Sequence, residues 1–86
     1  RPPTRQELAL TLFRYAKEAG LDTKKRAELT PYSDADQVAG WARDAVSWAV
    51  SAGLIVPSGE GTLRPADPAS RAEVAAILMK FSSLYL

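Results

Sequence analysis

Two arginines are the residues of this sequence best suited to binding chemistry. Arg5 lies in the segment TRQE and Arg71 in the segment SRAE, so each follows a hydroxyl residue and stands two positions before a glutamate. A guanidinium presents a rigid fork of donors that can hold a carboxylate through two parallel bonds. The two arginines therefore indicate a site for an anionic group, unless each pairs internally with an acid such as Asp34 or Asp67.

Both arginines are predicted to stand in the first turn of a helix. Thr4 with Glu7, and Ser70 with Glu73, have the spacing of a capping box, in which the hydroxyl and the carboxylate each accept from a backbone N–H of the other residue. Helix capping is the simplest role for these four residues. A positive charge in the first turn is repelled by the positive end of the helix dipole and costs about 0.3–1 kcal/mol. Two arginines placed there therefore suggest a functional role.

The two segments are part of a longer internal repeat. Residues 3–15 and 69–81 align without a gap at an offset of 66 residues, with hydroxyl, basic, acidic and apolar positions matched. Such self-similarity is typical of repeat architectures, because a unit this short cannot bury its apolar face without a stacked neighbour.

The elements that must position these residues are predicted to be three helices joined by long, turn-rich loops. Apolar residues recur at helical spacing over 4–19, over 41–55 and after Ser70, and the fold class is therefore all-α. Gly20 and Gly53 are expected to follow the ends of the first two helices in the left-handed conformation. Trp41 and Trp48 are seven residues apart and are expected on one side of the second helix, where core packing is the ordinary role.

Composition narrows the functional classes. The 86 residues allow one small domain, and a net charge of +1 gives no support to a nucleic-acid partner. There is no cysteine and no histidine, so disulfides, thiolate metal sites and the commonest general base are absent. No apolar run approaches the roughly 18 residues of a membrane span. We expect a binding domain without a metal, a cofactor or an enzymatic activity.

The order of these signals resembles the S-layer homology (SLH) domain. The features that carry the resemblance are "YSDA", then "WARDA", then "SAGLI", then "GEGTLRP" and finally "SRAE", spread over about 50 residues. Residues 32–86 resemble one complete SLH repeat, residues 2–20 the end of a preceding repeat, and residues 21–31 a connector. The chain opens inside a repeat, which we interpret as a piece of a longer array.

The resemblance implies a fold and a function. SLH repeats typically form a pseudo-threefold helical bundle with ligand grooves between neighbouring repeats. They hold proteins on the bacterial cell surface, outside the cell, by non-covalent binding to secondary cell-wall polysaccharide, which is often pyruvylated. The arginine of the TRAE-type motif is implied to meet the ketal-pyruvate carboxylate, and here the matching residues are Arg5 and Arg71.

Four other residues are candidates for contacts with such a polymer. An exposed indole can stack on a sugar face, glycines let the backbone approach a sugar closely, and a carboxylate can accept from hydroxyl groups. These candidates are Trp41, Gly59, Gly61 and Asp34. For Asp34 a structural role in a turn or cap is the simpler alternative.

The sequence departs from the family pattern in two ways. The first motif reads TRQE, and only about one and a half repeats are present instead of three. The rival hypothesis follows from the second departure: incomplete stacking would leave apolar helix surface for a neighbouring repeat, another protein or a second copy of the chain. That alternative is a protein–protein interaction module without carbohydrate binding.

Overall fold

The computed structural model describes all 86 residues, and its regular secondary structure is entirely helical. The three α-helices are α1 (Arg5–Glu18), α2 (Arg43–Ser51) and α3 (Arg71–Tyr85), and two single 3₁₀ turns, η1 (Ala35–Gln37) and η2 (Gly40–Ala42), precede α2. There is no strand, and one isolated bridge joins Thr4 to Pro68. The all-α prediction is confirmed. No helix combines the length and the apolar character that a membrane span requires.

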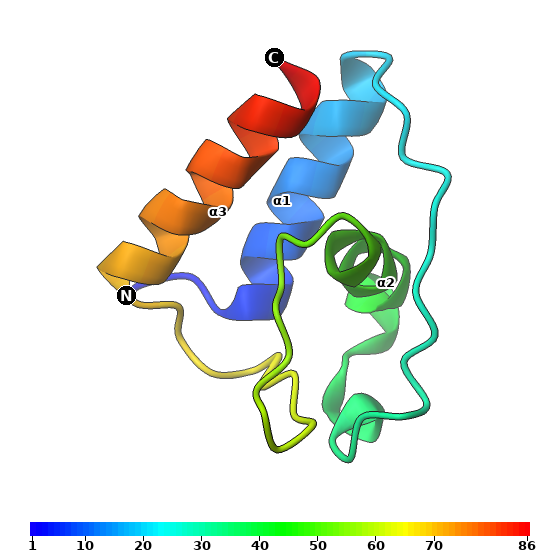
Figure 1. The fold of residues 1–86 in the computed structure, drawn as a ribbon, viewed down its shortest axis with the longest axis vertical. Coiled ribbons are helices and arrows are strands. Elements are labelled where there is room, and N and C mark those ends of the chain that lie inside the picture. Colours follow the sequence, from blue (N-terminus) through cyan, green and yellow to red (C-terminus); the bar gives the residue numbers. More distant parts are fainter.

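The helices α1 and α3 run side by side in the same direction, whereas α2 is seen almost end-on and crosses them (Figure 1). A long connector without regular helix leads from the end of α1 to η1 along the outer edge of the molecule (Figure 1). A second loop returns the chain from α2 to the start of α3. The two helices that carry the repeated motif therefore begin at the same end of the molecule.

Both predicted capping boxes are present. The Thr4 side chain accepts from the backbone N–H of Glu7, and the Glu7 carboxylate accepts from the backbone N–H of Thr4 at 2.8 Å. Ser70 and Glu73 repeat this arrangement at the start of α3. The helices begin where the sequence predicts because each cap satisfies backbone donors that the first turn leaves open.

The second helix is shorter than its sequence pattern predicts. The expected helix over 41–55 is divided: Gly40–Ala42 forms a 3₁₀ turn, and the α-helix covers only Arg43–Ser51. Gly53 has a φ of 77° and ends α2 as expected, and Leu54 then turns into the core. The change from 3₁₀ to α-helical winding alters the angle between successive side chains, with consequences for Trp41.

The core lies where α1 packs on α2 and where aromatic side chains of α3 contact both of these helices. Trp48 is its centre, because the indole contacts the rings of Phe13 at 5.4 Å and of Phe81 at 6.4 Å between centroids. The Trp48 side chain is almost fully buried, and its Nε1–H donates to the hydroxyl of Tyr85 at 3.2 Å. Residues from all three helices and from both loops complete this cluster.

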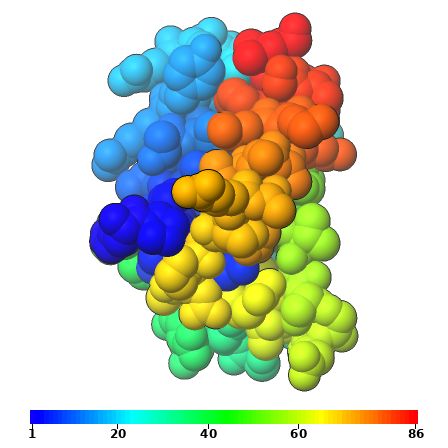
Figure 2. All heavy atoms as spheres, turned by 90° about the vertical axis from the view of Figure 1, so that its left-hand side faces the viewer, coloured from blue at the N-terminus to red at the C-terminus, as the bar shows by residue number.

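The two copies of the repeated motif are joined through the backbone. The N–H of Ala69 donates to the carbonyl of Pro3 at 2.9 Å, and the N–H of Arg5 donates to the carbonyl of Asp67 at 3.1 Å. In Figure 2 the dark-blue N-terminal residues accordingly lie against the yellow and orange segment that leads into α3. The start of each helix is thus held beside the start of the other.

Candidate functional site

The first of the two candidate arginines is buried and already holds a carboxylate. Only 8% of the Arg5 side chain is exposed, and its Nε and Nη2 atoms donate to both carboxylate oxygens of Glu73 at 2.7–2.9 Å. Its Nη1 donates to the carbonyl of Arg64 at 3.3 Å. Arg5 therefore has an internal partner, but that partner is Glu73 and not Asp34 or Asp67, the acids that the sequence suggested.

Glu73 performs two tasks in this arrangement. One of its oxygens accepts from the Ser70 backbone N–H as part of the capping box, while the carboxylate as a whole receives the Arg5 fork. These bonds, first to Ser70 and then to Arg5, lower the pKa of Glu73 from its ordinary value. Sequence reasoning assigned only the first task, because the second contact joins residues 68 positions apart.

The second arginine is open to solvent. Arg71 has no hydrogen bond to another side chain and lines a shallow groove with the first residues of the chain. The other lining residues are Pro2, Pro3, Ala69, Ser70, Val74, Ala75 and Leu78. An exposed guanidinium at the edge of a largely apolar groove, at the positive end of α3, is suited to an anionic ligand that also presents an apolar face.

The backbone N–H groups at the two helix starts show the same contrast as the two arginine side chains: they are bonded in α1 and free in α3. In α1 the N–H of Arg5 donates to Asp67 and the N–H of Gln6 donates to the carbonyl of Pro65 at 3.0 Å. In α3 the corresponding N–H groups of Arg71 and Ala72 have no acceptor in the chain. Arg71 therefore stands beside two open backbone donors, which also favour an anion.

Asp34 is buried and fixes the loop before α3. Its two carboxylate oxygens accept from the backbone N–H groups of Leu63 and Arg64, both at 2.8 Å. Burial would raise the pKa of Asp34, but these backbone bonds outweigh it and its pKa lies below the ordinary value. By accepting from the Arg64 N–H, the carboxylate also stabilises the backbone of Arg64 at a φ of +50°, a conformation that L-residues rarely adopt.

An Asp34→Asn variant is expected to lose about 2 kcal/mol of unfolding free energy at neutral pH, because the new amide group opposes one of the two backbone N–H donors. Urea unfolding followed by tryptophan fluorescence measures the loss. The exposed neighbour Asp36 provides the matched control, and Asp36→Asn should leave the midpoint unchanged. A midpoint for Asp34→Asn equal to that of the parent chain would contradict this role.

Stability should also fall in acid. The pKa values of Asp34 and Glu73 are depressed in the folded state, so their contribution is present above the ordinary carboxyl pKa of about 4. It is lost as the pH falls below that value towards the folded pKa. The urea midpoint should therefore decrease between pH ~6 and pH ~3, and less steeply in the Asp34→Asn variant. Equal slopes for the two chains would contradict the assignment to Asp34.

Trp41 is exposed, contrary to the prediction that core packing is its ordinary role. Its relative exposure is 58%, whereas Trp48 is 1% exposed. The reason is the 3₁₀ winding of Gly40–Ala42, which turns the first indole away from the side that buries the second. Trp41 does not line the Arg71 groove, so the structure does not bring these two candidates together.

Gly59 and Gly61 lie in a tight turn between Ser58 and Thr62. The N–H of Gly61 donates to the carbonyl of Ser58 at 2.9 Å, and the Ser58 and Thr62 hydroxyls are 2.7 Å apart. Gly61 has a φ of 77°, so the turn itself requires a glycine there. Neither glycine lines a groove with Arg5, Arg71 or Trp41.

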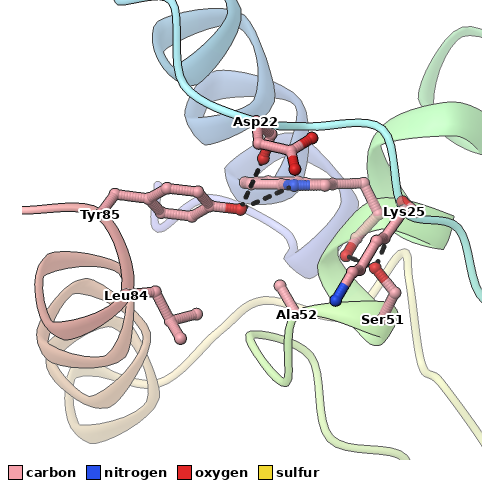
Figure 3. A pocket seen from close by; sticks show the side chains of 7 residues that line it. Asp22, Lys25, Ser51, Ala52, Leu84 and Tyr85 are labelled. Atoms are coloured by element: carbon pink, nitrogen blue, oxygen red, sulfur yellow. Dashed lines mark hydrogen bonds between the residues drawn. The ribbon is translucent and has the colours of Figure 1, made fainter.

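One further pocket was not predicted from the sequence (Figure 3). It lies between the ends of α2 and α3 and the connector, and the Tyr85 hydroxyl donates to the carbonyl of Asp22 at 3.1 Å on its wall. Figure 3 shows Leu84 pointing into this space opposite Lys25. No group of histidine, cysteine, aspartate or glutamate side chains in the chain is arranged to hold a metal ion.

Comparison with protein families gives one match. The S-layer homology domain profile matches residues 31–75, just over half of the chain. The chain belongs to the SLH family. The match includes Asp34, Trp41, the 59–61 turn and the SRAE motif with Arg71, while Arg5 lies outside it. Comparison with curated proteins and with solved structures gives no significant match.

The SLH family consists of binding and anchoring domains of bacterial cell-surface proteins, which attach to polymers of the cell wall. Family membership agrees with the all-helical fold and with the repeated motif. In this SLH chain the two TRAE-type arginines have different surroundings: Arg5 is bound inside the structure and Arg71 is exposed to solvent.

Proposed function

We propose that this SLH domain anchors a bacterial surface protein to the cell wall by binding a secondary wall polysaccharide without changing it chemically. In this proposal the guanidinium of Arg71 binds the carboxylate of a ketal-pyruvate group on the polymer. The observation that carries the proposal is the contrast between the two helix starts: the guanidinium of Arg5 and the N–H groups of Arg5 and Gln6 are bonded in α1, whereas the corresponding groups of Arg71 and Ala72 are free in α3.

The groove beside Arg71 supports a sugar-bound carboxylate in preference to a free anion. Pro2, Pro3, Val74 and Leu78 give it apolar surface, against which the methyl group of a pyruvate ketal and the face of a sugar ring would pack. The exposed indole of Trp41 serves in the proposal as a separate contact, stacking on another sugar of the same polymer. Asp34, Gly59 and Gly61 contribute by shaping the loop and not by direct contact.

The test is co-sedimentation of the purified domain with bacterial cell-wall sacculi, before and after chemical removal of the secondary polysaccharide. Binding to intact sacculi that is lost on stripping would support polysaccharide anchoring. A chain that is folded by circular dichroism and remains in the supernatant would contradict it.

An Arg71→Gln variant should bind intact sacculi about 10- to 100-fold more weakly, which corresponds to the loss of a charge-assisted pair with the ligand carboxylate. Arg43→Gln is the matched control, because Arg43 is also an exposed arginine at the first position of a helix and has acidic residues around it. Unchanged binding by Arg71→Gln would show that the carboxylate is bound elsewhere.

A second candidate function rests on a different observation. The helix α3 exposes Leu78, Met79 and Leu84, which is unusual for a surface helix and is typical of a contact surface. A protein–protein interaction module would use this surface, and the folded chain would remain in the supernatant with intact and with stripped sacculi. The two functions are therefore separated by the same experiment.

A further inference from the structure

The pocket between the ends of α2 and α3 and the connector lies apart from the groove of Arg71 (Figure 3). The helix α3 begins at Arg71, whereas Leu84 and Tyr85, which line the pocket, are at its other end. The volume of the pocket is about 290 Å³. Small-molecule sites usually have roughly 300–1,000 Å³, so a ligand of this pocket would be among the smallest.

The apolar surface of the pocket is held in place by a chain of hydrogen bonds. It is formed by Ala52 and Leu84 together with the rings of Trp48 and Tyr85. The Trp48 Nε1–H donates to the Tyr85 hydroxyl at 3.2 Å, and this hydroxyl donates to the carbonyl of Asp22 at 3.1 Å. These bonds join α2, α3 and the connector around the pocket, so a ligand does not have to order it on binding.

The pocket is also lined by two opposite charges that are not paired with each other. The Lys25 ammonium and the Asp22 carboxylate are exposed, and neither takes part in an ion pair of the chain. The Asp22 carboxylate accepts only from the backbone N–H of Lys24, at 3.0 Å. In Figure 3 the Lys25 ammonium lies beside Ala52 and opposite Leu84, while Asp22 lies at the top of the view.

The fold selects Lys25 from three consecutive basic residues, 24–26. Arg26 already has a contact, because its guanidinium lies over the ring of Phe13 at 5.1 Å from the centroid. The Ser51 hydroxyl, at the end of α2, donates to the carbonyl of Lys25 at 3.3 Å and holds this part of the connector beside the helix. Lys25 is therefore the basic residue of the three that lines the pocket.

We propose that this pocket binds a small free amino acid with an apolar side chain. The carboxylate of the ligand accepts from the Lys25 ammonium, its own ammonium donates to the Asp22 carboxylate, and its side chain packs on Leu84 and Ala52. A ligand with a negative charge alone would be repelled by Asp22, and one with a positive charge alone would be repelled by Lys25. Only a zwitterion is attracted at both positions.

The two tryptophans of the chain make the proposal testable by NMR, because Trp48 lines the pocket and Trp41 does not. Addition of L-leucine should shift the Trp48 indole N–H signal with saturation, at a Kd of about 1 mM for so small a ligand. The Trp41 indole signal should stay in place. A Trp48 signal that does not move, or one that moves together with that of Trp41 and without saturation, would overturn the proposal.

Two analogues of leucine test whether both charges are recognised. The compound 4-methylpentanoate lacks the ammonium, 3-methylbutylamine lacks the carboxylate, and both keep the branched apolar body. At matched ionic strength each should bind about 10-fold more weakly than leucine, or weaker still. If either analogue bound as tightly as leucine, the pocket would not recognise a zwitterion and the proposal would be wrong.

Substitutions at the two charges locate the site. Lys25→Gln should weaken leucine binding about 10-fold, whereas Lys24→Gln, a change at an exposed neighbour outside the pocket, should leave it unchanged. Asp22→Asn should cause a similar loss, since its amide oxygen can still accept from the Lys24 N–H but no longer attracts an ammonium. Asp36→Asn is its control. Equal dissociation constants for Lys25→Gln and Lys24→Gln would overturn the assignment.

The amino-acid site and the proposed polysaccharide site can fail separately. Arg71→Gln should leave the leucine titration unchanged, because Arg71 and the pocket are at opposite ends of α3. A chain that does not bind sacculi but shows the saturable Trp48 shift would lose only the anchoring function. A weaker leucine affinity in Arg71→Gln would show that the two sites are not independent and would contradict the assignment to this pocket.

Discussion

An Arg5→Ala variant is expected to lose about 3 kcal/mol of unfolding free energy, which is a large part of the stability of so small a domain. The substitution leaves the Glu73 carboxylate in a half-buried position without its cation, and it also leaves the carbonyl of Arg64 without a donor. Breaking a buried ion pair costs about 3–5 kcal/mol. The lower end of that range applies here because 37% of the Glu73 side chain is exposed. Urea unfolding followed by tryptophan fluorescence measures the change.

The chain contains a matched control for this variant. Arg1 donates to both carboxylate oxygens of Glu7 at 2.8–2.9 Å, so it makes the same pair with the equivalent glutamate of α1, but on the surface. The bond from Arg1, together with that from the Thr4 backbone, lowers the pKa of Glu7 to about 2. Arg1→Ala should nevertheless leave the urea midpoint unchanged, because exposed pairs are screened by solvent. Equal midpoint changes for the two variants would contradict the role of burial.

A Trp48→Ala variant should be largely unfolded at room temperature. Truncating a buried aromatic residue costs about 3–5 kcal/mol, and here the indole contacts the rings of Phe13, Phe81 and Tyr85. Its Nε1–H also donates a hydrogen bond to the hydroxyl of Tyr85, which the substitution removes. Far-ultraviolet circular dichroism and the dispersion of amide NMR signals report the loss of structure.

Trp41→Ala is the control for Trp48→Ala, since it removes the same side chain from a position that is 58% exposed. The folded signal and the urea midpoint of Trp41→Ala should match those of the parent chain. A Trp41→Ala variant that unfolds as readily as Trp48→Ala would show that the 3₁₀ turn needs its indole for packing.

The local signals in the sequence were sufficient for the helix starts. Thr4 with Glu7 and Ser70 with Glu73 lie three residues apart, and a capping box depends only on such neighbours. The glycine after α2 is equally local. The family was also identifiable, because its motifs are short and ordered along the chain.

The contacts between distant residues could not be predicted in this way. The pairing of Arg5 with Glu73 depends on how the starts of α1 and α3 approach each other, and that of Asp34 with the Leu63 and Arg64 backbone depends on how two loops approach. No spacing in the sequence specifies either. The position of Trp41 was missed for a different reason. A helical periodicity assumes α-helical winding, and the 3₁₀ turn at Gly40–Ala42 breaks the assumed register.

The bridge between Thr4 and Pro68 has a mechanical consequence. A load applied between the first residues and Arg71 crosses the hydrogen bonds from Ala69 to Pro3 and from Arg5 to Asp67, together with the clasp of Arg5 on Glu73. The packed rings around Trp48 lie outside this short path. The hydrogen bonds and the ion pair at the base of the domain therefore bear such a load before the packed core does.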